Sequence, residues 1–172
     1  MIRPALPPLS PVLFAAALAA LLAAPLAAKD SLGMFDNWGA FRDANVPRCY
    51  AIAKPRETRR AKDYDAYVDI ATWPARGVRG QVHFRLSRKM AKGSQIRLAV
   101  GGERFVLTGG GGDGWAQDKR MDAGIVAAMR SAGSMSVSAR DAAGRGFVDE
   151  YDLAGAATAM DAATVGCAKL GR

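Results

Sequence analysis

Hydrophobic and polar residues alternate along several stretches of the chain, and this pattern predicts β-strands. Within residues 80–88, the apolar side chains of Val82, Phe84 and Leu86 are separated by polar ones. Such alternation is typical of an antiparallel strand with one face in a core and the other facing solvent. The same reasoning predicts further strands at residues 35–41, 46–55, 66–73, 95–100, 103–109, 134–140 and 146–153.

Glycine-containing turns connect two pairs of these strands into predicted hairpins. Gly101-Gly102 separates residues 96–100 from 103–109 and permits a two-residue turn with positive φ. The loop at 141–145 (DAAGR) joins the strands at 134–140 and 146–153. Residues 80–108 are therefore expected to form adjacent antiparallel strands.

Two stretches lack the period of two and are predicted to be helices. In residues 117–133, Met121, Ile125 and Met129 recur every four positions, which is the spacing of a helical apolar stripe. Asp118 is a suitable N-cap and Gly133 a suitable stop. The Ala-rich residues 153–166 predict a second helix.

The first 28 residues have the composition of a secretory signal peptide. Arg3 is their one charge, residues 11–28 carry none, and small residues precede Lys29. A transmembrane anchor is the alternative, but the apolar run from 12 to 24 spans only 13 residues, whereas a bilayer core requires about 20. Cleavage near Ala28 leaves residues 29–172, and we expect this chain to be periplasmic or secreted.

The mature chain is expected to form one mostly β domain. Its predicted elements are seven or eight strands and two short helices, arranged as β-sandwich-like antiparallel sheets over residues 29–172. A chain of this length suits a single domain with a sizeable core. No long apolar stretch follows residue 28, so the mature form is predicted to have no transmembrane span.

Cys49 and Cys167 are the only two cysteines of the chain. Export to an oxidising compartment would allow them to pair, and a Cys49–Cys167 disulfide is our prediction. Free or intermolecular thiols are the alternative. Catalytic or metal-binding cysteines are disfavoured, because the chain contains only one histidine, His83, to serve as a base or ligand.

Positive charge is concentrated in residues 54–62, KPRETRRAK, within a chain of net charge +8. Removing Arg3 with the signal peptide would leave +7. The segment lies between two predicted strands and is expected to be an exposed loop. A solvated loop is the simplest interpretation, and contact with an anionic surface such as lipid headgroups or acidic glycan is the sharper hypothesis. The cations assigned to this site are Lys54, Arg56, Arg59, Arg60 and Lys62.

The sequence contains no motif that identifies a reaction. TGGGGDGW, residues 108–115, lacks the Lys and the Ser or Thr of a phosphate-binding loop, and is interpreted as a flexible surface loop. His83 is interpreted as facing solvent. Asp63, Asp65 and Asp69 lack the glycine and glutamate spacing of a calcium loop. No metal, cofactor or nucleic-acid ligand is predicted.

Two segments resemble a known family. FDNWGAF followed by RCYAIAKP, and the stretch MDAGIVAAMRSAGSMSVSARDAAGRGFVDEYDLAGAATAMDA, are similar to the opening and closing patterns of the invasion-associated locus B family. The resemblance covers roughly residues 31 to 165. It implies a secreted or periplasmic β-sandwich-like domain without known catalysis, linked in pathogens to host-cell entry. The family's cysteine pair before the first helix is replaced here by GGGGDGWAQ, so its disulfides do not transfer.

These observations favour a non-enzymatic envelope protein that binds or supports an anionic component or another envelope protein. Trp38 and Trp73 are expected to belong to the core, because large aromatic side chains dominate core burial. The alternative is an envelope hydrolase whose catalytic Asp or Glu residues cannot be grouped from sequence. That alternative requires carboxylates with perturbed pKa values in one cleft.

Overall fold

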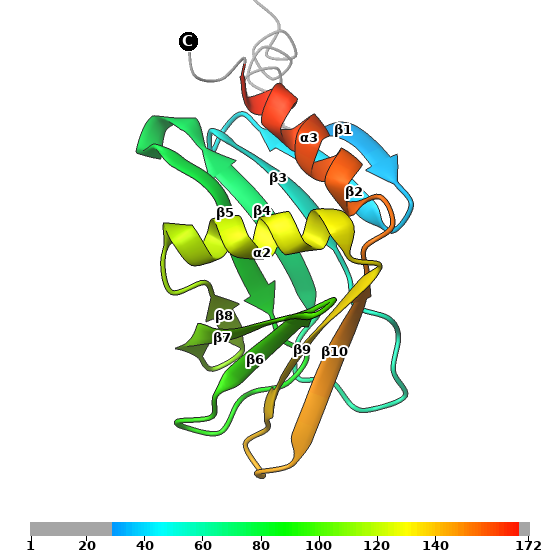
Figure 1. Ribbon diagram of the computed structural model, residues 1–172, viewed down its shortest axis with the longest axis vertical. Helices are drawn as coiled ribbons and strands as arrows, with labels where there is room; N and C mark the ends of the chain where they lie inside the picture. Colours follow the sequence, from blue (N-terminus) through cyan, green and yellow to red (C-terminus); the bar gives the residue numbers. More distant parts are fainter. Residues whose placement is uncertain (1–28, 169–172) are drawn as a thin grey trace, which may run out of the picture.

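A computed structural model describes residues 29–168, and the predicted signal peptide lies outside this range. Within this range, ten strands and two α-helices follow one another in the order shown in Figure 1. The strands are β1 (Asp30–Phe35), β2 (Trp38–Asp43), β3 (Arg48–Ala53), β4 (Tyr67–Trp73), β5 (Val78–Arg85), β6 (Ile96–Val100), β7 (Glu103–Gly110), β8 (Asp113–Trp115), β9 (Ser134–Arg140) and β10 (Gly146–Asp152). The helices are α2 (Lys119–Ser131), α3 (Ala156–Cys167) and the short 3-10 helix η2 (Pro74–Arg76).

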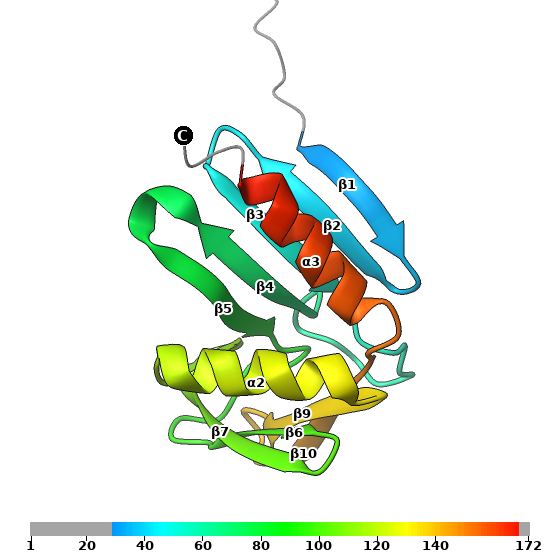
Figure 2. The ribbon, with the colours of Figure 1, turned by 45° about the horizontal axis from the view of Figure 1, so that its top comes forward.

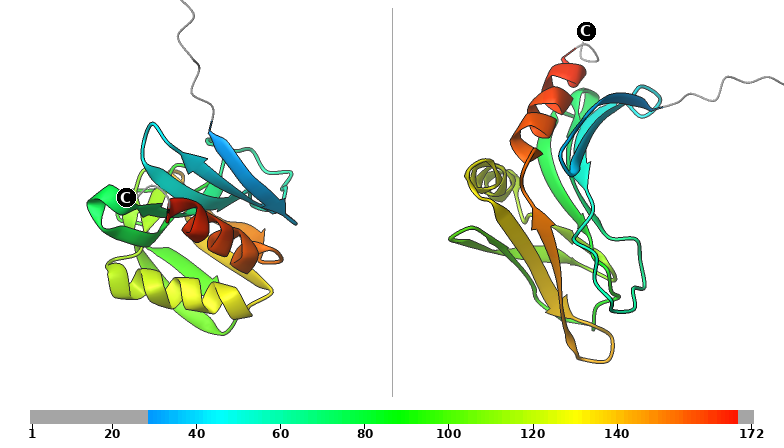
Figure 3. Two further views of the ribbon diagram at one scale, coloured as in Figure 1. Left: turned by 90° about the horizontal axis from the view of Figure 1, so that it is seen from above. Right: turned by 90° about the vertical axis from the view of Figure 1, so that its right-hand side faces the viewer.

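All ten strands belong to one antiparallel sheet that curls back on itself. The strand order is β1-β2-β3-β4-β5-β8-β7-β6-β9-β10. Viewed from the side, the half containing β6, β9 and β10 is inclined toward the half containing β3, β4 and β5 (Figure 3). The predicted mostly β single domain with two short helices is confirmed, and its two halves are parts of one continuous sheet.

Alternating side chains of the strands build the core between the two halves. Val82, Phe84 and Leu86 are fully buried, as the period of two in β5 predicts. From the other half, Leu98 and Val137 are also fully buried and lie in the same cluster. Burial of this kind is the main favourable contribution to folding.

Both helices pack against the sheet and lie next to each other in front of the strands in Figure 2. Helix α3 lies against β1, β2 and β3, whereas α2 lies against β5 and reaches β6 and β7. The predicted N-cap of α2 is confirmed, because the Asp118 carboxylate accepts a hydrogen bond from the Met121 amide. The helix ends at Ser131, two residues before the predicted stop at Gly133. Neither helix is long and apolar enough to cross a membrane.

The predicted strand at residues 35–41 is confirmed at residues 38–41, which belong to β2, but it is not continuous. The chain reverses at Asp36-Asn37, so that β1 ends at Phe35 and β2 begins at Trp38, and the two strands form a hairpin. Asp36 has φ 49°, a left-handed conformation that Asp and Asn tolerate better than most residues. A turn therefore divides what the sequence pattern presented as one strand.

The glycine run at residues 108–115 was predicted to be a flexible surface loop, and this prediction is wrong because most of the run belongs to strands. Gly109 and Gly110 extend β7, the chain turns at Gly111 with φ 67°, and residues 113–115 form β8. At Gly112 a Cβ would overlap the ring of Tyr64, so only glycine permits this packing. The strands β8 and β7 lie between β5 and β6 in the sheet. The prediction that residues 80–88 and 96–100 form adjacent strands is therefore wrong.

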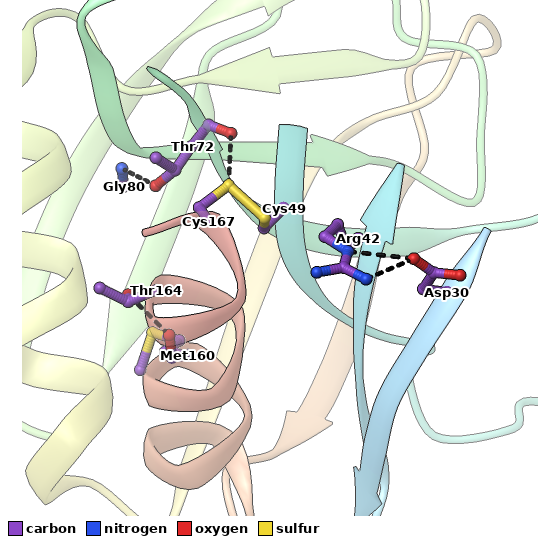
Figure 4. Close-up of a disulfide and its surroundings, with 8 residues drawn as sticks. All are labelled: Asp30, Arg42, Cys49, Thr72, Gly80, Met160, Thr164 and Cys167. Carbon is purple, nitrogen blue, oxygen red and sulfur yellow. Dashed lines mark hydrogen bonds and ion pairs between the residues drawn. A yellow bond between two sulfur atoms is a disulfide. The ribbon is translucent and has the colours of Figure 1, made fainter. Parts of the chain in front are cut away.

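A disulfide joins the beginning of the domain to its last helix. Cys49 in β3 and Cys167 at the end of α3 are bonded, with their Cα atoms 5.5 Å apart and 118 residues between them (Figure 4). Both residues are buried, and the described residues contain no free cysteine. The predicted pairing is confirmed.

Of the two tryptophans assigned to the core, only Trp38 is fully buried. Its side chain is 0 % exposed, and its Nε1 donates a hydrogen bond to the Asp152 carbonyl, 2.9 Å away. Trp73 is only partly buried, and its ring lies 6.0 Å from the Arg48 guanidinium. The prediction for Trp73 is therefore wrong: this residue ends β4 and pairs with Val78 at the tip of the β4–β5 hairpin.

Candidate functional site

The predicted basic loop, residues 54–62, is exposed and connects β3 to β4 as expected. Each of the five cations assigned to the site is classed as exposed: Lys54, Arg56, Arg59, Arg60 and Lys62. The loop runs beside β10, because the Arg56 amide donates to the Glu150 carbonyl at 2.7 Å and Arg60 Nη1 approaches the Gly146 carbonyl at 3.5 Å. The charges are thus displayed along one edge of the sheet.

Arg56 differs from the other cations of the loop because it forms ion pairs with β10. Its Nε donates to Asp152 Oδ2 at 3.0 Å, and its Nη1 lies 3.5 Å from Glu150 Oε2. The hydrogen bond to Asp152 is the main cause of the raised Arg56 pKa, and Arg56 in turn lowers the pKa of Asp152. Arg56 therefore anchors the loop, which sequence reasoning missed because its partners lie 94 and 96 residues further on.

Contacts with residues 87–89, which follow β5, hold the other end of the basic loop. The Asp63 amide donates to the Ser87 carbonyl at 2.8 Å, and the Asp63 carboxylate accepts from the Lys89 amide at 2.8 Å. Arg88 Nη1 donates to the Ala61 carbonyl at 2.9 Å. Since both ends are fixed, the cations between them are presented by a segment with defined anchor points.

Four loop cations have no carboxylate partner within residues 29–168: Lys54, Arg59, Arg60 and Lys62. Unpaired exposed cations attract anions from solution, an effect that salt screens. The loop also borders a shallow groove of about 560 Å³, called here the outer groove, whose apolar lining includes Met34, Phe41 and Ile52 and whose wall includes Lys54. Cationic and apolar surfaces therefore meet at the start of the loop.

His83 lies in a polar cluster on the outer face of β4, β5 and β8, which corrects its interpretation as a solvent-facing residue. Its side chain is 16 % exposed. Nδ1 lies 3.2 Å from Asp69 Oδ2, and Nε2 lies 3.1 Å from Asp113 Oδ1. The ring stacks on Trp115, with ring centroids 5.0 Å apart. The cluster forms because strand register places His83 opposite both Asp69 and Trp115.

Arg85 completes the charge balance of this cluster. Its Nη1 lies 2.6 Å from Asp113 Oδ2, and its guanidinium lies 3.9 Å above the Tyr64 ring. Burial lowers the pKa of His83, but the hydrogen bonds and charges of Asp69 and Asp113 outweigh that effect and raise its pKa above the ordinary value of 6.5. Both ring nitrogens face carboxylates, which favours the protonated imidazole and engages each nitrogen in a contact within the cluster.

A pH-dependent contribution to stability follows from His83. A histidine whose pKa is higher in the folded than in the unfolded protein contributes its full stabilisation at pH values below the unfolded-state pKa. This contribution is lost as the pH rises through the folded-state pKa. We expect the difference in unfolding free energy between the parent and His83→Gln to be larger at pH 5 than at pH 9. Urea denaturation at both values tests this. His83 is the only histidine, so its NMR titration is unambiguous, and a pKa below 6.5 would contradict the prediction.

The carboxylates whose pKa is raised have structural roles. Burial raises the pKa of Asp122 and of Asp149. Asp122 accepts a hydrogen bond from the Val82 amide, and Asp149 accepts one from the Ser87 amide, each at 2.8 Å. Neither residue lines the outer groove or the second groove, which lies between the two helices and is described next. These two carboxylates with raised pKa values therefore do not converge in a groove, as the active site of a hydrolase would require.

A second groove of about 650 Å³, called here the helix groove, lies between the two helices and the β4–β5 hairpin. Residues of β4, β5, α2 and α3 line it, including Ile70, Arg79, Val126 and Met160. These four residues were not predicted as site residues, because they belong to four separate elements of the chain. The spacing of apolar residues in α2 was the one available signal.

Comparisons of this chain with protein families, with curated proteins and with solved structures find no match.

Proposed function

We propose that this protein is an exported, non-enzymatic binding domain of the bacterial cell envelope, and that its basic loop contacts an anionic envelope component. The observation that carries the proposal is the group of four exposed loop cations without carboxylate partners in residues 29–168. The signal-peptide composition supports export. The resemblance to the invasion-associated locus B family is in keeping with this proposal and remains a prediction.

The anchored loop explains how binding would occur without a deep pocket. Arg56 and Asp63 fix the two ends, so less conformational freedom is lost when the cations between them meet a surface. Lipid phosphates and glycan carboxylates offer the same anionic chemistry. Each cation near an anionic membrane contributes about 1 kcal/mol, so several must act together for measurable affinity.

The test replaces loop cations that have no structural contact. We expect Lys54→Ser/Arg59→Ser/Lys62→Ser to bind phosphatidylglycerol vesicles on the order of 100-fold more weakly than the parent at low salt, since three cations are removed. Co-sedimentation measures the binding. Parent binding should fall steeply by about 0.15 M salt, where the Debye length is about 8 Å. Arg56 is left intact because it anchors the loop.

A matched control removes the same charge elsewhere. Lys92→Ser/Arg104→Ser/Arg120→Ser changes three other exposed cations and should retain most of the binding. Equal losses in the two triple variants would attribute binding to net charge and refute the role of the loop. Phosphatidylcholine vesicles give the uncharged reference, and alginate tests the glycan source: loop-dependent binding to alginate alone would identify a glycan, whereas binding to neither anion refutes the proposal.

A further inference from the structure

The helix groove has the size and composition of a small-molecule site. Its volume of about 650 Å³ lies within the roughly 300–1,000 Å³ typical of ligand pockets. Three structural units form its walls: the β4–β5 hairpin, α2 and α3. Figure 4 shows part of this wall, where Thr72, Gly80, Met160 and Thr164 lie on one side of the disulfide.

Apolar side chains from the sheet and both helices meet inside the groove. Ile70, Met160 and Ala163 line it and are 6 %, 4 % and 5 % exposed, and Val126 of α2 is half-buried beside them. The hydroxyls at its edge have partners, because Thr72 Oγ1 accepts from the Gly80 amide and Thr164 Oγ1 donates to the Met160 carbonyl. The interior therefore offers contact to an alkyl chain and few unsatisfied polar groups.

Every charged residue that lines the groove is a cation. Arg79, Lys119 and Arg130 contribute side chains, and no Asp or Glu lines it. Arg130 is paired with Asp161 at 2.6 Å, whereas Arg79 and Lys119 have no carboxylate partner within the part of the chain that the structure describes. The nearby carboxylates of Asp118 and Asp122 accept hydrogen bonds from backbone amides.

From this combination we propose that the helix groove binds a single-chain amphiphile with an anionic head, such as a medium-chain carboxylate. The alkyl chain lies among Ile70, Val126 and Met160, and the anionic head meets Arg79 and Lys119. An amphiphile with the same alkyl chain but a cationic head is expected to bind more weakly, because no carboxylate lines the groove to pair with that head. This site is separate from the basic loop and does not depend on the function proposed for that loop.

Binding of two probes with equal chains and opposite charges tests the proposal. By isothermal titration calorimetry below micellar concentrations, we expect decanoate to bind at one site, and decyltrimethylammonium to bind at least tenfold more weakly. Arg79→Ser/Lys119→Ser should weaken decanoate binding at least tenfold and remove the preference between the two probes. Equal affinity of the parent for both probes, or no detectable decanoate binding, would overturn the proposal.

A pair of tryptophan variants locates the site without disturbing the core. Ala123 is exposed and lines the groove, whereas Ala127, one turn further along α2, is exposed and does not. Ala123→Trp should reduce decanoate affinity at least tenfold by filling the groove, and Ala127→Trp should bind as the parent does. Thermal unfolding checks that both variants fold. An Ala123→Trp protein that folds and binds like the parent refutes this site, as does loss of decanoate binding in Lys54→Ser/Arg59→Ser/Lys62→Ser.

Discussion

Reduction of the Cys49–Cys167 disulfide should lower the melting temperature of the mature protein by roughly 10 °C. The bond closes a loop of 118 residues. Disulfides typically contribute about 2–4 kcal/mol, and more for longer loops, by restricting the unfolded chain. For a domain of this size, each 1 kcal/mol shifts the melting temperature by roughly 2–8 °C. Differential scanning calorimetry with and without reductant measures the effect.

The double variant Cys49→Ala/Cys167→Ala provides the control. It should melt near the temperature of the reduced parent and should not respond to reductant. The unreduced parent, once denatured, should contain no titratable thiol. Two thiols per chain in that assay would show that the bond is absent from the protein as purified.

Truncating Trp38 should produce a comparably large loss of stability. Its side chain is 0 % exposed, and its indole nitrogen donates to the Asp152 carbonyl, which links β2 to β10 across the core. Replacing a buried Trp by Ala typically costs about 3–5 kcal/mol, and the Asp152 carbonyl would lose its partner. Because domains are stable by only about 5–15 kcal/mol, Trp38→Ala should unfold at a much lower urea concentration than the parent.

Trp115→Ala is the matched comparison for this experiment. Trp115 is 37 % exposed and stacks on His83 at the outer face, so its removal should cost about 1 kcal/mol. Urea unfolding is monitored by circular dichroism, because each variant lacks a tryptophan and its fluorescence signal therefore differs from that of the parent. Similar midpoints for the two variants would contradict the distinct roles that burial assigns to these residues.

Local patterns in the sequence were sufficient to predict most strands and both α-helices, including α3 at Ala156–Cys167. The period of two in β5 and the Asp118 cap of α2 depend only on near neighbours, so composition and spacing reveal them. The disulfide was predictable because a chain with two cysteines has one possible internal pair. The hairpin turn at Asp36 was missed because its left-handed conformation competes with an apparently continuous strand pattern.

The candidate sites depend on contacts that sequence patterns do not encode. Asp113 lies in a glycine run that the sequence marks as a loop, yet β8 brings it beside His83, 30 residues earlier. The acidic partners of Arg56 come from β10, so a loop with five cations in its sequence presents four without a carboxylate partner in residues 29–168. Strand order decides these neighbours, and strand order could not be inferred from local periodicity.

The path of the basic loop has a consequence for self-association. β10 is the last strand of the sheet, and an uncovered edge strand is a template on which another chain can add a strand and aggregate. The Arg56 amide occupies the Glu150 carbonyl on this edge, and the Arg56 side chain holds the neighbouring carboxylates. The loop therefore covers part of the β10 edge, and we expect the segment that displays positive charge also to hinder the addition of a second copy of the protein at this strand.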